Sequence, residues 1–160
     1  MSAEIIGLRQ WFETPPGRYL LEWERARFDE AVADIFGYHA LQLGLPELDT
    51  LRTNRMPHKW QATAAPPPAD HAAAFATDFS ALPFAESSLD LVTLPHTLEM
   101  HVDPHATLRE VGRVLVPEGR VVICCLNPAS LWGLRQRRAR LYQRMGFGRL
   151  FLPDAGDFLG

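Results

Sequence analysis

The stretch "SLDLVTLPHTLEMHVDPHATLREVGRVLVPEGRVVICCLNP", residues 88–128, decides the fold, because it holds a strand pattern, a helix pattern and a second strand pattern in succession. The helix pattern, residues 103–119, opens with "DP", which suits an N-cap and the first helical position, and closes with "PEG". The last pattern, residues 121–126, is continuously apolar, as is typical of a strand buried on both faces of a parallel sheet. This order predicts an α/β fold with a mostly parallel central sheet flanked by helices.

Working outward, the region before this stretch adds further elements of the same kind. Residues 13–36 predict a turn followed by a helix, and residues 38–44, "YHALQLG", predict the first strand. The helix places apolar side chains on one face, namely Leu21, Phe28, Ala31, Val32 and Ile35. Residues 48–56, "LDTLRTNRM", are the candidate for a second strand, and the Ala- and Pro-rich residues 62–74 are expected to form a surface linker.

The chain of 160 residues is expected to be a single domain, with an N-terminal helical or lid segment at 1–36 and an α/β domain at 37–160. Its net charge of −3 gives no basic field that would attract nucleic acid. It shows neither a signal-peptide pattern nor 18 consecutive apolar residues, so no membrane association is expected. The two cysteines, Cys124 and Cys125, would point to opposite faces of a strand, which fits a reducing cytoplasm.

Residues 78–127 carry short motifs in a fixed order. They are Asp78, "LPF" at 82–84, "LDLV" at 89–92, His96 with "LE" at 98–99, "DP" at 103–104 and "LREV" at 108–111. This ordered set resembles the class I S-adenosylmethionine-dependent methyltransferases, in the branch called methyltransferase type 11. That family shows an acidic residue followed by "LPF", then "SFDLV", "H-x-LEH" and "DP…LREV-RVL-PGG". The resemblance covers about a third of the chain, and it implies a Rossmann-like fold, S-adenosylmethionine as cofactor and a small-molecule methyl acceptor.

The resemblance also implies a cofactor site beyond the carboxyl ends of the strands, where open α/β sheets bind their ligands. Asp78 would accept a hydrogen bond from the adenine amino group, and Phe79 would cover the ring. Pro95 and His96 would lie near the pocket floor, and Gly44 would match the first glycine of the cofactor loop. From the residues alone, Asp78 could equally cap a turn and Phe79 could belong to the core, so both interpretations stay open.

No catalytic residue is assigned, and His96 is the only candidate. A histidine can act as a base near neutral pH. Methyl transfer, however, often needs only aligned reactants, and a histidine that follows a strand more often makes structural hydrogen bonds. Glu99 is expected at a helix end or in packing. No histidine or cysteine spacing is typical of a zinc site, so no metal centre is expected.

The cofactor loop departs from the family pattern "LDLGCGTG". Gln42 stands where an acid is usual, and Pro46 and Leu48 fall near the positions of the later glycines. Glycines there permit positive φ and close approach of the backbone to the ligand, whereas proline removes a donor and leucine adds bulk. The acid that usually holds the ribose hydroxyls is also absent from residues 51–60.

The end of the chain departs as well. The family's sheet closes with two more strands after the helix that follows "NP", and residues 129–146 predict that helix. The chain then stops at "FLPDAGDFLG", which predicts a truncated sheet that lacks its C-terminal strands. This end favours a fragment or truncated product of a longer protein, and the alternative is a partner that covers the exposed sheet edge. An open sheet edge favours a covering partner, for which a homodimer is one solution.

Three functions therefore remain open from the sequence. The first is a methyltransferase, and the second is a non-catalytic binding or scaffold protein that kept the fold and lost the cofactor loop. The third is a nucleic-acid binder that uses the arginines of residues 134–144, "LRQRRARLYQR". The net charge favours a solvated helix face for those arginines over a nucleic-acid surface.

Overall fold

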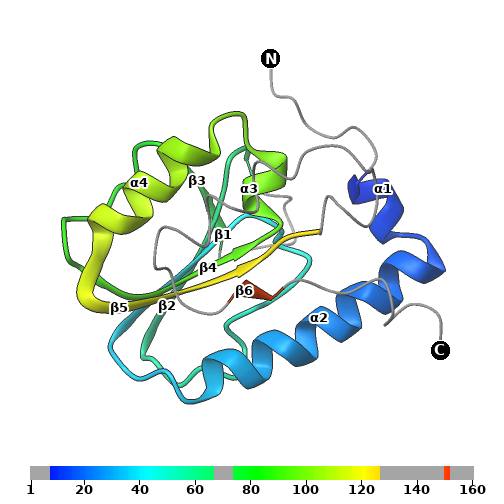
Figure 1. Cartoon of the computed structure of the whole chain (residues 1–160), viewed down its shortest axis with the longest axis horizontal. Coiled ribbons are helices and arrows are strands. Elements are labelled where there is room, and N and C mark those ends of the chain that lie inside the picture. The colour runs from blue at the N-terminus through cyan, green and yellow to red at the C-terminus, as the bar shows by residue number, and fades with distance from the viewer. Residues whose placement is uncertain (1–7, 67–73, 127–149, 152–160) are drawn as a thin grey trace.

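A computed structural model describes residues 8–66, 74–126 and 150–151 of the chain (Figure 1). The helix predicted over residues 129–146, with its arginines, lies outside the described residues. The described helices are α1 (Leu8–Phe12), α2 (Pro15–Ala33), α3 (Thr97–Met100) and α4 (Pro104–Val114). The strands are β1 (His39–Leu43), β2 (His58–Thr63), β3 (Ala74–Ala76), β4 (Leu89–Pro95), β5 (Leu115–Cys124) and β6 (Leu150–Phe151).

All strand pairs are parallel, and the sheet has the order β3-β2-β1-β4-β5-β6. This is the order of a doubly wound Rossmann-type sheet, so the predicted α/β fold is confirmed. The chain builds outward from β1 in one direction and then returns to place β4 on its other side. The crevice between the carboxyl ends of β1 and β4 is thus the switch point at which such sheets bind ligands.

The sequence did not predict the strand β6. It pairs with the end of β5 through Ile123–Leu150 and Cys124–Phe151, so one short parallel strand follows β5 where the sequence predicted none.

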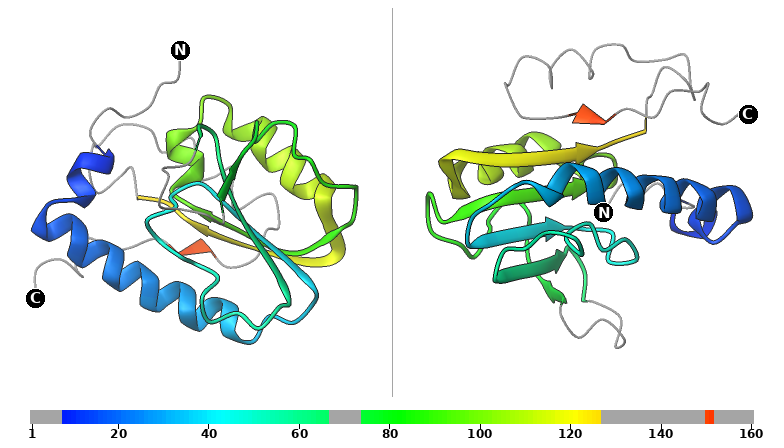
Figure 2. Two further views of the ribbon diagram at one scale, coloured as in Figure 1. Left: turned by 180° about the vertical axis from the view of Figure 1, so that it is seen from behind. Right: turned by 90° about the horizontal axis from the view of Figure 1, so that it is seen from below.

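Two hydrophobic cores lie on opposite faces of the sheet, under α2 and α4 (Figures 1 and 2). Neighbouring residues of one strand divide between them, because side chains alternate across a sheet. Cys125 packs in the α4 core and Cys124 in the α2 core, so the two cysteines point to opposite faces, as predicted. Both are free and buried.

The prediction for the second strand was wrong. Residues 48–56 form turns, and β2 lies further on, at residues 58–63. Leu48, Leu51 and Met56 are buried because these turns fold over the α2 face of the sheet, which gives an apolar pattern without a strand. The predicted linker at 62–74 was also too long, since its first two residues finish β2 and its last residue begins β3.

The start of α2 follows from its sequence. Thr14 is the N-cap and accepts a hydrogen bond from the Gly17 amide at 3.4 Å, while prolines fill the first helical positions. A Cβ at Gly17 would lie 2.0 Å from the Trp11 carbonyl oxygen, so glycine is needed where α1 meets α2. Among the described residues, no helix is long and apolar enough to cross a membrane.

Candidate functional site

The predicted site residues follow the carboxyl ends of three strands. Gly44 comes directly after β1, Asp78 and Phe79 follow β3, and His96 follows β4, whose last residue is Pro95. The sequence order of strands and loops therefore brings residues far apart in the chain to one edge of the sheet.

Gly44 is the residue nearest to the switch point. Its φ of 81° is in the left-handed region, which glycine adopts without strain. A Cβ at this position would lie 3.4 Å from Thr97 Oγ1 and 3.9 Å from Phe79 Cε2. The structure thus brings Gly44 and Phe79 together, and it adds Thr97, which the sequence did not single out.

The loop after Gly44 packs against the core of the protein. Leu45 and Leu48 are only 1% and 0% exposed, because they pack in the α2 core. Leu45 has a φ of 43°, a left-handed conformation that is unfavourable for a branched side chain and that the surrounding packing must hold.

Gln42 holds this loop together from inside the sheet. Its Nε2 lies 3.0, 3.0 and 2.7 Å from the carbonyl oxygens of residues 44, 45 and 48. Its Oε1 accepts hydrogen bonds from the amide and the hydroxyl of Thr50 at 3.0 and 2.8 Å. A carboxylate could not donate to these carbonyls, so the amide that replaces the family's usual acid matches the loop conformation seen here.

Asp78 caps a turn and Phe79 packs in the core, which is one of the two interpretations that the sequence left open. Asp78 is exposed, and its Oδ1 accepts hydrogen bonds from the Ser80 amide at 2.8 Å and the Ser80 hydroxyl at 2.6 Å, which caps the turn. These bonds from Ser80 lower the pKa of Asp78. Phe79 is 4% exposed and stacks on His101 with ring centroids 5.4 Å apart. Among the described residues, Oδ2 of Asp78 makes no hydrogen bond, so it is available to a ligand.

The end of β2 lacks a carboxylate. Because β2 ends at Thr63, the position of the family's ribose acid falls there and not within residues 51–60. The described residues that follow, 64–66, are "AAP". The hydroxyl of Thr63 donates to the Ala65 carbonyl at 2.5 Å.

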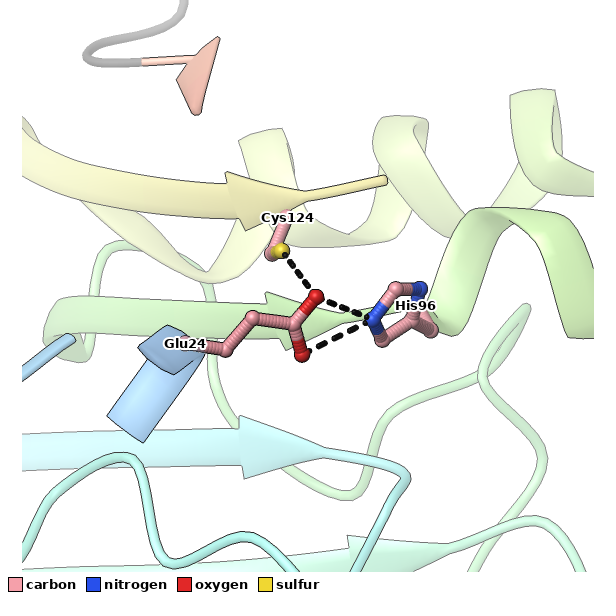
Figure 3. A group of neighbouring side chains, drawn as sticks. All are labelled: Glu24, His96 and Cys124. Atoms are coloured by element: carbon pink, nitrogen blue, oxygen red, sulfur yellow. Dashed lines mark hydrogen bonds and ion pairs between the residues drawn. The ribbon is translucent and has the colours of Figure 1, made fainter. Parts of the chain in front are cut away.

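His96 is fully buried and has both ring nitrogens engaged. Figure 3 shows the contacts of one of them with Glu24. Nε2 lies 2.9 and 3.0 Å from the two carboxylate oxygens of Glu24, and Nδ1 lies 2.7 Å from Glu99 Oε1. Cys124 Sγ donates to Glu24 Oε1 at 3.4 Å. The network joins α2, the end of β4, α3 and the end of β5, and it leaves His96 no free nitrogen for a substrate.

The charge state of His96 follows from these partners. Burial disfavours the imidazolium, but hydrogen bonds with Cys124, Glu24 and Glu99 outweigh it and raise the pKa of His96 well above its ordinary value. Burial also raises the pKa of the Cys124 thiol to about 11, so this thiol is a protonated donor. The geometry favours the structural role of His96 over the catalytic one.

Sequence reasoning missed Glu24, although a signal was present. Glu24 lies three residues after Leu21 and four before Phe28, so a charged residue interrupts the apolar stripe of the helix. The residue is 1% exposed, and a buried charge needs a partner.

A cavity of about 430 Å³ lies at the opposite edge of the sheet, where β4 and β5 begin. Its lining includes four carboxylates and one arginine, namely Glu30, Asp34, Asp90, Glu118 and Arg120. It is far along the strands from Gly44 and Asp78, and therefore it is not the predicted cofactor site.

Comparisons with known proteins agree with the fold. The family described as "Methyltransferase domain" matches residues 53–123. The uncharacterized protein YafS of Escherichia coli is 32% identical over 127 residues, which are 79% of this chain and 51% of YafS. A demethylmenaquinone methyltransferase of Mycolicibacterium paratuberculosis is 47% identical over 55 residues, 34% of this chain and 24% of that protein. The chain thus spans about half of the length of YafS and about a quarter of the length of the mycobacterial protein.

Two solved structures share the fold. One is the complex of the Haloferax volcanii Trm112 methyltransferase activator with a putative methyltransferase, with a TM-score of 0.54, 23% identity and coverage of 71% of this chain and 57% of that one. The other is an S-adenosylmethionine-dependent methyltransferase of Thermotoga maritima, with a TM-score of 0.52, 14% identity and coverage of 74% and 56%. The sheet order and the matched family together define the class of protein. Residues 53–123 match the methyltransferase domain family of type 11, and the described sheet has the fold of the class I methyltransferases.

Proposed function

We propose that the chain binds S-adenosylmethionine at the carboxyl edge of its sheet and transfers the methyl group to a small-molecule acceptor. One observation supports this most strongly. Gly44 and Phe79 come together at the switch point, with the free Asp78 Oδ2 in the same loop as Phe79. Open α/β sheets bind nucleotide-type ligands at this place.

The residues present fit the adenosine end of the cofactor. The free oxygen of Asp78 would accept the adenine amino group, since its lowered pKa keeps it ionised at neutral pH. The ring of Phe79 would cover the adenine, and Gly44 would allow close approach of the backbone. When bound, the cofactor supplies the methyl group on a sulfonium. The described residues directly after β2, 64–66, include no acid, so among these residues the ribose is left to backbone groups and water.

The chain's own contribution to the reaction is positioning. Aligned reactants account for much of the rate of such displacements, without a general base. Pro95 and His96 would form the floor of the pocket at the end of β4, with His96 held rigid by Glu24 and Glu99. We assign no residue of this chain as an acid or base for the acceptor.

A second candidate is a non-catalytic relative that keeps the fold without the cofactor. The observation that favours it is the closed loop, in which Gln42 satisfies the carbonyls and Leu45 and Leu48 enter the core. Methyl transfer remains the first proposal because Gly44, Asp78 and Phe79, the residues proposed for the adenosine end, are all present at this edge of the sheet.

The setting of the protein is part of the proposal. We place it in the cytoplasm, supported by two free buried cysteines and no disulfide among the described residues. We divide it into an N-terminal helical segment at 1–36 and an α/β domain at 37–160, and a homodimer would cover an open sheet edge.

Calorimetric titration with S-adenosylmethionine and S-adenosylhomocysteine tests the proposal. We expect micromolar binding of both, and a loss of at least about tenfold in affinity in Asp78→Ala, in keeping with a hydrogen bond to a charged group. Asp34→Ala is the matched control, because Asp34 is equally exposed but lies after α2, beside the other edge of the sheet. No binding to the wild type, at concentrations up to millimolar, would instead support the non-catalytic candidate.

A further inference from the structure

Three buried side chains with metal-binding chemistry share one small volume. Glu24 comes from α2, His96 follows β4 and Cys124 ends β5 (Figure 3). Their exposed fractions are 1%, 0% and 2%, and one potential ligand atom from each lies within 4.8 Å of the others. Oxygen, nitrogen and sulfur ligands of this kind are those that zinc prefers.

The distances between these atoms are close to those of a tetrahedral site. Ligands that lie about 2.0–2.3 Å from one zinc ion are separated from each other by about 3.3–3.7 Å. Here Cys124 Sγ lies 3.4 Å from Glu24 Oε1, and His96 Nε2 lies 2.9 and 3.0 Å from the two oxygens of Glu24. The distance between His96 Nε2 and the Glu24 oxygens would have to open by a few tenths of an ångström to admit an ion. One oxygen of Glu24, the nitrogen of His96 and the sulfur of Cys124 then provide three tetrahedral ligand atoms, and the second oxygen of Glu24 completes the coordination at a longer distance, without water.

The surroundings of His96 resemble those of a metal ligand. Its other nitrogen, Nδ1, faces Glu99 Oε1 at 2.7 Å, and the same oxygen accepts a hydrogen bond from the Leu126 amide at 2.7 Å. Histidines that bind metals almost always donate their second nitrogen to a carboxylate or carbonyl in this way. The backbone of His96 also has a φ of 53°, a strained conformation that occurs preferentially at ligand clamps and active sites.

The charges also balance. In the hydrogen bonds seen here, His96 Nε2 and Cys124 Sγ each face an oxygen of Glu24 through a proton. A divalent ion would replace the proton on His96 Nε2 and the proton on Cys124 Sγ, so the net charge in the buried volume would not change. A metal ion deprotonates a coordinating thiol outright, so the proton on the Cys124 thiol would not prevent binding.

We infer that Glu24, His96 and Cys124 form a closed structural site for a thiophilic divalent ion of the zinc type. The ion fastens the helix α2 to the carboxyl ends of β4 and β5. The site shares His96 with the floor of the proposed cofactor pocket, but an ion held there does not take part in methyl transfer.

Metal content and cobalt spectroscopy on the full chain test this inference. We expect the purified protein to retain about one zinc ion per chain after gel filtration, as closed structural sites do. After removal of zinc with a chelator, Co²⁺ should give visible tetrahedral bands and a near-ultraviolet thiolate charge-transfer band. The wild type alone already decides the question, since neither retained zinc nor a cobalt spectrum would overturn the inference and leave a network of protons only.

Two alanine variants of neighbouring cysteines locate the ion. Cys124→Ala should lose the charge-transfer band and bind Zn²⁺ at least about tenfold more weakly, because it lacks the thiolate ligand. Cys125→Ala should keep both properties, since Cys125 points to the other face of the sheet. Equal zinc affinity in both variants would overturn the assignment to this cluster. Glu24→Gln provides a second test of the site if Cys124→Ala does not fold.

Discussion

At the scale of single residues, the side chain of Gln42 decides the shape of the cofactor loop. Its amide donates into a group of three carbonyls and accepts from Thr50, all inside the protein. We expect Gln42→Glu to lower the free energy of unfolding by about 2–4 kcal/mol, because the change buries a charge and removes the donors. Urea denaturation measures this difference.

The matched control is Gln61→Glu. Gln61 pairs with Gln42 across β1 and β2 but is partly exposed, so the same change there should cost less than about 1 kcal/mol. Equal costs at both positions would show that the amide of Gln42 does not hold the loop.

Two glycines in helices make opposite predictions. At Gly17, a Cβ would lie 2.0 Å from the Trp11 carbonyl, so Gly17→Ala should destabilise the protein by about 1–3 kcal/mol. At Gly112, in α4, nothing lies within 4 Å of an added Cβ, so Gly112→Ala should stabilise it by about 0.5–1 kcal/mol. Thermal unfolding of both variants checks this, and a change of the same sign in both would contradict the packing described for α1 and α2.

At the scale of elements, α4 fastens the loop that carries Asp78 and Phe79. Glu110 accepts a hydrogen bond from the Leu82 amide at 2.9 Å, and Arg113 donates to the carbonyls of Phe84 and Leu82 at 3.0 and 3.1 Å. Glu110 and Arg113 also pair directly, at 2.8 Å. This loop takes the place of a helix between β3 and β4, and these polar contacts position it.

The pair predicts a dependence of stability on pH. The hydrogen bond from Arg113 lowers the pKa of Glu110 below its ordinary value. The stability that the ionised Glu110 contributes is therefore fully present when the pH is above the ordinary pKa of a glutamate. It is lost as the pH falls through the lowered pKa of Glu110 in the folded protein. Glu110→Gln should cost about 0.5–1.5 kcal/mol at neutral pH, and the difference from the wild type should vanish in acid. Denaturant unfolding of both proteins, at pH values from 7 into the acid range, measures this difference in the free energy of unfolding. A difference between Glu110→Gln and the wild type that stays constant with pH would refute this role of the carboxylate.

The elements also show what the sequence could and could not predict. Residues 103–114 carry their own signals, a capping Asp103, a proline and an apolar stripe, so the existence of α4 and of the strands on either side was predicted correctly. The predicted end of the helix at residues 117–119 was wrong, because α4 ends at Val114 and residues 115–119 already belong to β5. The second strand was misplaced because Leu48 and Leu51 are buried in turns. The local pattern of apolar residues does not distinguish a buried turn from a buried strand. The partnership of Glu24 with His96 spans 72 residues, and no local pattern encodes a contact at that distance.

At the scale of the whole molecule, two ends of one sheet offer different sites. The carboxyl edge carries the residues that the family resemblance predicts, whereas the amino ends of β4 and β5 border the acidic cavity. The fold was predictable because residues 88–126 alone establish the strand–helix–strand order. The conformation of the cofactor loop was not predictable. The sequence showed that the later glycines of the family pattern are missing, but it did not show that Gln42 holds the loop through hydrogen bonds to its carbonyls.

Hydrogen exchange with and without S-adenosylhomocysteine tests the central claim most directly, because it locates the ligand as well as detecting it. We predict protection of the backbone amides in residues 43–50 and 78–82, with no change around residues 116–122 at the acidic cavity. Protection confined to residues 116–122, or no protection at saturating ligand, would contradict a cofactor site at the carboxyl edge of the sheet.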